Sequence, residues 1–131
     1  PVWITAAGGS TPYITTTKLY FNPSTGTLNS TIFNSLSDIS VKTNINILQN
    51  SLEKVMSLRG VSFNWKDNNK KSIGLIAQEV EKIIPEVVDT NEKNKLKSVS
   101  YDSLVAVLIE AVKEQQKQID NLTEKVRRLE K

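Results

Sequence analysis

The chain has 131 residues with 17 basic and 14 acidic side chains, a net charge of +3, and neither cysteine nor histidine. The lack of cysteine excludes disulfides and thiol chemistry, and the lack of histidine removes the usual general base and the commonest metal ligand. Basic residues form no cluster of the kind that binds nucleic acid, and no apolar run approaches the ~20 residues needed to cross a bilayer, so we predict no cofactor, metal, nucleic-acid or membrane partner.

Residues 1–36 contain a single charged side chain, Lys18, and favour β-structure. Residues 18–22 alternate between two faces, residues 23–26 supply the proline and glycine of a turn, and residues 27–32 can return as a second strand. So few large apolar groups cannot bury themselves alone. We therefore expect the end of an extended β-structured fibre that several chains share. An ordinary hairpin is the alternative.

Residues 37–100 show the mixed pattern of a small domain with both helices and strands. Asn50 followed by Glu53 resembles a helix capping box. The helix that it begins is expected to stop at Gly60. Its apolar stripe is predicted to consist of Leu52, Val55 and Met56, with Ile47 as a further candidate.

The remainder of this domain is predicted to contain short strands, turns and one further helix. Residues 61–65 alternate cleanly and predict a strand whose inward side chains are Val61, Phe63 and Trp65. The later elements are a polar loop at 66–71, a strand at 73–76, a helix at 77–84 ended by Pro85, a strand that starts at 87, and an exposed turn at 91–95. The helix at 77–84 is expected to bury Ile76, Val80, Ile83 and Ile84.

Residues 101–131 carry a heptad pattern that predicts one long helix, capped by Asp102 or Ser103. The core positions are Val105, Val112, Ile119 and Val126 at a, and Leu108, Gln115, Leu122 and Leu129 at d. Lys125 and Glu130 could pair between chains. β-Branched residues at a with leucine at d favour a two-stranded coiled coil, and the polar Gln115 can fix the register. The alternative is a helix that folds against its own domain.

A hydroxyl and an amine stand five positions apart in Ser37-Asp38-Ile39-Ser40-Val41-Lys42. A serine hydroxyl needs an adjacent base before it can act as a nucleophile, and Lys42 is the base that this segment offers. A free lysine has a pKa of ~10.4, whereas a general base works best at ~7–8, so the amine must be desolvated. Alternatively, Ser37 and Asp38 only cap a helix and Lys42 is a solvated charge; the spacing alone does not decide between the two.

Several segments resemble one family. The hexapeptide at 37–42 is followed by 58–65 (LRGVSFNW), 74–80 (GLIAQEV), 85–88 (PEVV), 99–101 (VSY) and 108–114 (LIEAVKE). Together they resemble the intramolecular chaperone and auto-processing domain of bacteriophage tail spikes and tail fibres, which also occurs in endosialidase tailspikes and in a membrane-tethered eukaryotic transcription factor. Residues 19–28 (LYFNPSTGTL) are similar to phage fibre sequence.

This resemblance implies a division of the chain at the bond between Leu36 and Ser37. Residues 1–36 would be the end of a tail fibre or spike that stays in the virion. Residues 37–131 would be a chaperone that acts in the host cytoplasm. It would form a homotrimer, contact the upstream fibre of the same polypeptide, and then leave by self-cleavage. The implied fold is α+β with a long C-terminal coiled-coil helix at 101–131. A trimer conflicts with the two-stranded tendency of the heptads, and we favour the trimer because such fibres are three-fold.

The resemblance places the catalytic pair on Ser37 and Lys42. Ser37 would attack the carbonyl of Leu36 to give an ester that water then releases, so the chain would be a single-turnover serine endopeptidase. Asp38 is expected to orient the turn or cap a helix rather than act as a third catalytic group. Packing between chains would bury the lysine. A structural trimerisation module with an inert pair is the main alternative, and nucleic-acid binding by the C-terminal helix rests only on the mild positive charge.

Overall fold

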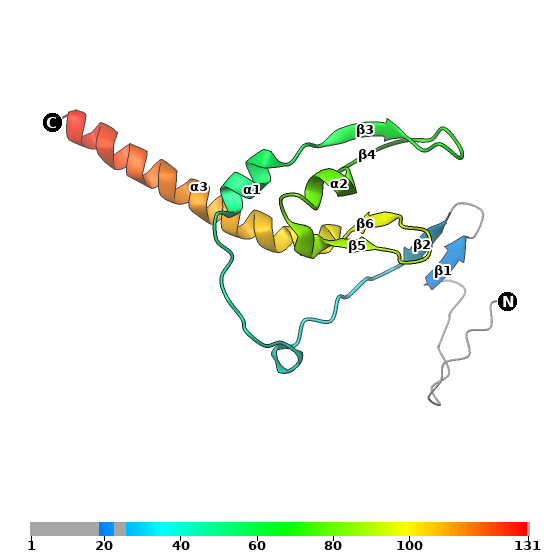
Figure 1. The fold of residues 1–131 in the computed structure, drawn as a ribbon. Coiled ribbons are helices and arrows are strands. Elements are labelled where there is room, and N and C mark those ends of the chain that lie inside the picture. The colour runs from blue at the N-terminus through cyan, green and yellow to red at the C-terminus, as the bar shows by residue number, and fades with distance from the viewer. Residues whose placement is uncertain (1–18, 23–25, 131) are drawn as a thin grey trace. The chain divides into compact units, whose positions relative to one another are not determined.

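The computed structural model describes residues 19–22 and 26–130, and the chain divides into two compact units, the first ending at Ile45 and the second starting at Asn46. Short strands and a long C-terminal helix make up a mixed α/β fold, as predicted (Figure 1). The predicted boundary after Leu36 lies inside the first unit. The boundary was predicted as a cleavage site rather than as a packing boundary, and it stays a prediction, as does the trimer.

The first unit contains one hairpin and a long exposed segment. Strand β1 (Leu19–Asn22) pairs antiparallel with β2 (Thr27–Ser30), and Gly26 takes a positive φ of 64° in the connection, as the turn prediction requires. Beyond β2 lies one short 3₁₀ helix, η1 (Ile39–Val41). The large apolar side chains of this segment are exposed in the single chain: Ile32, Phe33, Leu36, Ile39, Val41 and Ile45.

The second unit packs two hairpins and two short helices against the first part of a long helix. The hairpins are β3 (Val61–Asn64) with β4 (Lys71–Gly74) and β5 (Val88–Thr90) with β6 (Lys97–Val99), both antiparallel. The helices are α1 (Ser51–Ser57), α2 (Ala77–Val80), the 3₁₀ helix η2 (Pro85–Val87) and α3 (Tyr101–Leu129). The core consists of Val80, Ile84, Val87, Leu104 and Val107.

The strand and helix boundaries differ from the prediction near residues 65–85. β4 begins two residues earlier than expected because Trp65 N–H donates to the carbonyl of Lys70 at 3.0 Å and closes the loop early. The helix predicted at 77–84 is α-helical only to Val80, and residues 81–83 continue as turns. Ile84, which precedes Pro85, lies outside the helical region with φ −138° and ψ 72°. The buried positions Val80 and Ile84 are confirmed.

Three side chains predicted to face inward are exposed, among them Ile47, which is 73% exposed. Met56 lies on the outer side of α1 and is 77% exposed, and Trp65 is 54% exposed. Trp65 packs edge-on against Phe63, with ring centroids 5.2 Å apart and an interplanar angle of 82°. The alternation of the strand is correct through Phe63, but the strand ends at Asn64 and no longer directs Trp65 inward.

The start of α1 is capped by a distant carboxylate rather than by the predicted capping box. Asn50 has a positive φ of 55° and its side chain makes no cap hydrogen bond. The two oxygens of Glu114 accept hydrogen bonds from the backbone N–H groups of Ser51 and Leu52, each at 2.9 Å. These bonds satisfy two donors that a helix start leaves open, and they fasten α1 to α3.

Replacing Glu114 with alanine is expected to release the start of α1. The hydrogen bonds from Leu52 and Ser51 lower the pKa of Glu114, and Lys54 adds a smaller electrostatic effect. Because the folded pKa is lowered, the stabilisation is present above the ordinary carboxyl value of about 4.3 and is lost as pH falls through the folded value. Hydrogen exchange of the Ser51 and Leu52 amides should be about tenfold faster in Glu114→Ala at neutral pH.

The matched control for this change is Glu110→Ala. Glu110 lies one turn earlier on α3 and pairs only with the exposed Lys113, at 2.7 Å, an interaction that contributes little. Its replacement should leave amide exchange in α1 unchanged. Equal exchange rates in Glu114→Ala and the unsubstituted chain would show that the carboxylate does not hold α1.

Ser51 is the one fully buried polar side chain of the described residues, and its hydroxyl has no hydrogen-bond partner. A buried unsatisfied polar group costs about 1–3 kcal/mol. We expect Ser51→Ala to stabilise the protein by about 1 kcal/mol and to raise Tm by about 4–8 °C in a thermal unfolding measurement. Ser51→Val should instead overpack the site and destabilise it by about 1–3 kcal/mol. A lower Tm in Ser51→Ala would contradict the unsatisfied hydroxyl.

Gly74 ends β4 where the hairpin meets the start of α3. A Cβ at this position would lie 2.6 Å from the Tyr101 hydroxyl oxygen. That oxygen accepts a hydrogen bond from Leu75 N–H at 2.8 Å. The absence of a side chain at Gly74 therefore lets Tyr101 reach the backbone and join the hairpin to α3.

α3 presents two different apolar faces. Its inner face buries Leu104, Val107 and Ala111 against the rest of the second unit. The first three turns of α3 thus fold against their own domain, as the alternative prediction had it. From residue 115 to 130 every side chain is exposed, and this half extends past the other elements of its unit (Figure 1). The helix begins at Tyr101 with Ser100 as N-cap, so the predicted caps Asp102 and Ser103 lie inside its first turn.

Candidate active site

Ser37 and Lys42 come together in the first unit. Lys42 Nζ donates hydrogen bonds to Ser37 Oγ at 2.6 Å and to the Ser37 carbonyl oxygen at 3.1 Å. The turn η1 between them folds the backbone back on itself, and Lys42 N–H closes it by donating to the carbonyl of Ile39 at 3.1 Å. The structure therefore has a hydroxyl and an amine in the direct contact that activation of a serine requires.

Asp38 caps the turn inside this pair. Its Oδ1 accepts hydrogen bonds from the backbone N–H of Ser40 at 2.8 Å and from the Ser40 hydroxyl at 2.6 Å. The side-chain bond from Ser40, followed by the backbone bond, lowers the pKa of Asp38. Asp38 thus orients the turn, as predicted from the sequence.

The pair lies in solvent in the single chain. Ser37 and Lys42 are both exposed, and Leu36, on the other side of the bond that would be cut, is 81% exposed. One chain therefore brings the hydroxyl and the amine into contact without covering them with apolar side chains.

A second lysine–hydroxyl contact in the chain differs in one decisive respect. Lys97 Nζ donates to Thr90 Oγ1 at 2.8 Å and also to Glu81 Oε1 at 2.7 Å. The carboxylate makes Lys97 part of an ion pair with Glu81, with 2.7 Å between Nζ and Oε1. Lys42 has hydroxyl and carbonyl oxygens as its partners, so it is the better candidate for a base. No local sequence pattern points to the contact of Lys97, since Glu81, Thr90 and Lys97 lie in different parts of the second unit.

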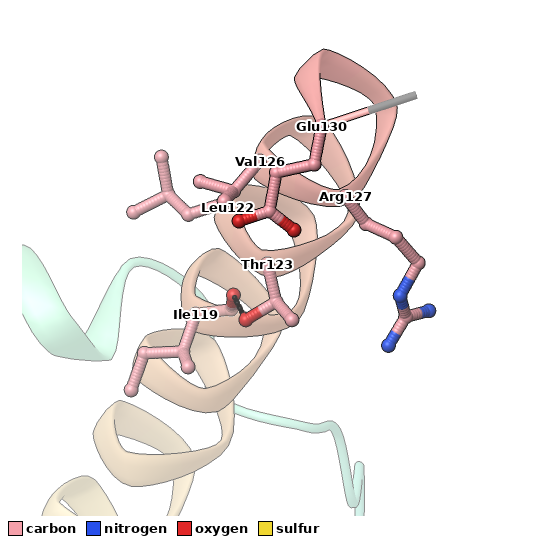
Figure 2. Close-up of a pocket in the computed structure, with 6 residues that line it drawn as sticks. All are labelled: Ile119, Leu122, Thr123, Val126, Arg127 and Glu130. Carbon is pink, nitrogen blue, oxygen red and sulfur yellow. Dashed lines mark hydrogen bonds between the residues drawn. The ribbon is translucent and has the colours of Figure 1, made fainter.

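The outer face of α3 is the other candidate surface. An open groove of about 480 Å³ lies along its C-terminal half, and Figure 2 shows Ile119, Leu122 and Val126 projecting to the same side of the helix. These are predicted heptad core positions, and each is about half exposed or more, at 49%, 60% and 53%. Arg127 points away from them (Figure 2). These three side chains therefore form an apolar surface on the C-terminal half of α3 that one chain leaves open.

Neither a metal-binding cluster nor a membrane-spanning helix is found among the described residues. Within 19–22 and 26–130, no three acidic, histidine or cysteine side chains come together in a way that could hold a metal ion. In the same part of the chain, no helix combines the length and the apolar character needed to span a membrane.

Comparison with known proteins points to one family. Residues 37–89 match the family model Peptidase_S74, described as "Chaperone of endosialidase". The long tail fiber proteins Gp37 of Enterobacteria phages K3 and T2 are each 32% identical to the chain over 98 residues. The match covers 69% of this chain but only 8% and 7% of those proteins, so the chain spans less than a tenth of their length. The family resemblance seen in the sequence is confirmed.

Proposed function

Because residues 37–89 belong to the endosialidase chaperone family, we propose that residues 37–131 assemble a phage tail fibre and then release themselves from it. Residues 1–36 would be the end of that fibre and would remain in the virion tail, while the chaperone acts in the host cytoplasm. The release step is cleavage between Leu36 and Ser37. The observation that carries this proposal is the 2.6 Å contact between Lys42 Nζ and Ser37 Oγ.

The assembly role rests on the outer face of α3. Val105, Val112, Ile119 and Val126 repeat every seven residues and are exposed in the single chain. Three copies of α3 would bury these stripes against one another, with the Gln115 side chains meeting in one polar layer. The heptad pattern favours a dimer by itself. We propose a trimer because the relatives are tail fibre proteins, which the resemblance implies to be three-fold.

The proposed cleavage begins with proton transfer from Ser37 Oγ to an uncharged Lys42 Nζ. The hydroxyl oxygen then bonds to the carbonyl carbon of Leu36, and the bond from that carbon to Ser37 N breaks as Lys42 returns the proton to the leaving nitrogen. The product is an ester between Leu36 and Ser37 Oγ. Water activated by the same amine hydrolyses the ester and leaves a carboxylate on Leu36 and a free amino group on Ser37.

Assembly would switch on this chemistry by excluding water from the pair. The side chains of Leu36, Ile39, Val41 and Ile45 surround it in sequence and are exposed in one chain. Covering them with neighbouring chains would desolvate the amine and favour its uncharged form. A chain that has not assembled would then stay intact, so the chaperone would leave only a completed fibre.

A structural trimerisation module is the competing function, favoured by the exposure of Lys42 in the single chain. Mass spectrometry of the assembled, unsubstituted protein over time separates the two. The proposal expects products of residues 1–36 and 37–131, formed faster as the protein concentration rises through the range of assembly. An intact chain after prolonged incubation as an oligomer would favour the structural module.

A further inference from the structure

The turn between Ser37 and Lys42 has little to hold it besides hydrogen bonds. η1 is three residues long and is closed by two backbone hydrogen bonds. One of them is longer than a usual hydrogen bond, with 3.4 Å between Val41 N and the Asp38 carbonyl oxygen. All six residues from 37 to 42 are exposed, so burial contributes little to their order. An exposed segment of this length otherwise loses its conformation to chain entropy.

Asp38 and Ser40 supply the missing restraint. A single carboxylate oxygen of Asp38 accepts both the backbone N–H and the hydroxyl of Ser40, at 2.8 and 2.6 Å. Both bonds are shorter than the backbone bond of 3.4 Å that they reinforce. They span the part of the chain that must bend for Lys42 to reach Ser37.

We propose that Asp38 and Ser40 are positioning residues, whose mutual hydrogen bonds fix the turn that sets Lys42 Nζ against Ser37 Oγ. This inference rests on the proposed self-cleavage. Asp38 acts through Ser40 and the backbone, since its carboxylate accepts the Ser40 N–H and hydroxyl within the turn rather than contacting the reacting hydroxyl or amine. The sequence alone gives no role to Ser40, and its two hydrogen bonds to Asp38 add it to the positioning residues.

The test compares cleavage rates of assembled Asp38→Ala, Asp38→Asn and Ser40→Ala by mass spectrometry. Loss of the acceptor in Asp38→Ala should slow cleavage about tenfold to a hundredfold, because small misplacements of reacting groups cost this much. Asp38→Asn should restore the rate to within about threefold, since its amide oxygen can still accept from Ser40 N–H. Ser40→Ala keeps the backbone bond and should slow cleavage about two- to fivefold. The pH profile of cleavage should keep its shape in all three.

The outcomes divide clearly. Failure of the unsubstituted chain to cleave would defeat the proposed function itself. Cleavage of Asp38→Ala at the unsubstituted rate would overturn only the positioning role. The role is also overturned if Asp38→Asn is as slow as Asp38→Ala, or shifts the pH profile, since charge would then matter rather than the turn. Altered oligomer size of Asp38→Ala by sedimentation would assign Asp38 to assembly and overturn it too.

Discussion

Lys42→Arg is expected to stop the proposed self-cleavage while leaving the fold unchanged. Arginine keeps a positive charge and hydrogen-bond donors, but it stays protonated in proteins and cannot take the proton of Ser37. Positioned acid–base groups contribute about 10²–10⁴-fold to a rate, and cleavage should fall by at least that factor. Because Lys42 is exposed in the single chain, its replacement removes no packing within that chain. Mass spectrometry of the assembled variant over time measures the effect.

The matched control is Lys97→Arg. Lys97 also contacts a hydroxyl, that of Thr90, but it belongs to an ion pair with Glu81 that arginine can keep. Its replacement should leave the cleavage rate within about twofold of the unsubstituted chain. Cleavage by Lys42→Arg at a rate close to normal would remove Lys42 from the mechanism, whatever its contact with Ser37.

Chemical rescue distinguishes a base from a structural contact. Lys42→Ala removes the amine and opens space beside the Ser37 hydroxyl. A small primary alkylamine added in solution should restore part of the cleavage, increasingly at higher pH as more of the free amine is uncharged. Ser37→Ala should not respond, because it has no nucleophile.

Local patterns predicted those parts of the fold that are made by neighbouring residues. The hairpin at β1 and β2 follows from alternation and from Gly26, and α3 follows from sustained periodicity. The contact of Ser37 with Lys42 could also be predicted, because it spans a single turn. The spacing alone is common in proteins, so the prediction of a catalytic pair depends on the family resemblance.

Features made by distant residues were beyond such reasoning. Glu114 caps α1 from more than sixty residues away, and no local signal distinguishes it from other acidic residues of α3. Asn50 looked like the cap because its type and its spacing to Glu53 were suitable, yet its backbone lies in the left-handed region. The exposure of Met56 has a similar origin. An apolar pattern predicts which side chains share one face of a helix, but it does not predict which other element packs on that face.

α3 connects the stability of one chain to the association of several. Its first turns have two apolar faces. Leu104, Val107 and Ala111 face the chain's own core, while Val105 and Leu108 on the neighbouring face remain exposed. The second unit is therefore folded against the same helix that offers the outer stripe. Substitutions in the outer stripe beyond residue 115 can change association without removing contacts within the chain, because that half of α3 is fully exposed.

Leu122→Glu is the second change with a large expected effect, and it should dissociate the proposed trimer. Leu122 is 60% exposed in one chain, so the substitution leaves the fold of that chain intact. In a trimer it removes three leucines from the interface, at about 1.5–3 kcal/mol each, or about 5–9 kcal/mol in all, and it places three carboxylates near one another. Sedimentation at micromolar concentration should show monomers, with helix content by circular dichroism reduced only at the end of α3.

Asn121→Glu is the matched control, because it introduces the same charge one residue earlier, outside the heptad core. It should leave both the trimer and the cleavage rate unchanged. If assembly supplies the water-free surroundings of Lys42, Leu122→Glu should also stop cleavage, although residue 122 lies 85 residues along the chain from Ser37. A trimer that survives Leu122→Glu would show that the outer stripe is not the interface, and cleavage by a monomeric variant would separate the chemistry from assembly.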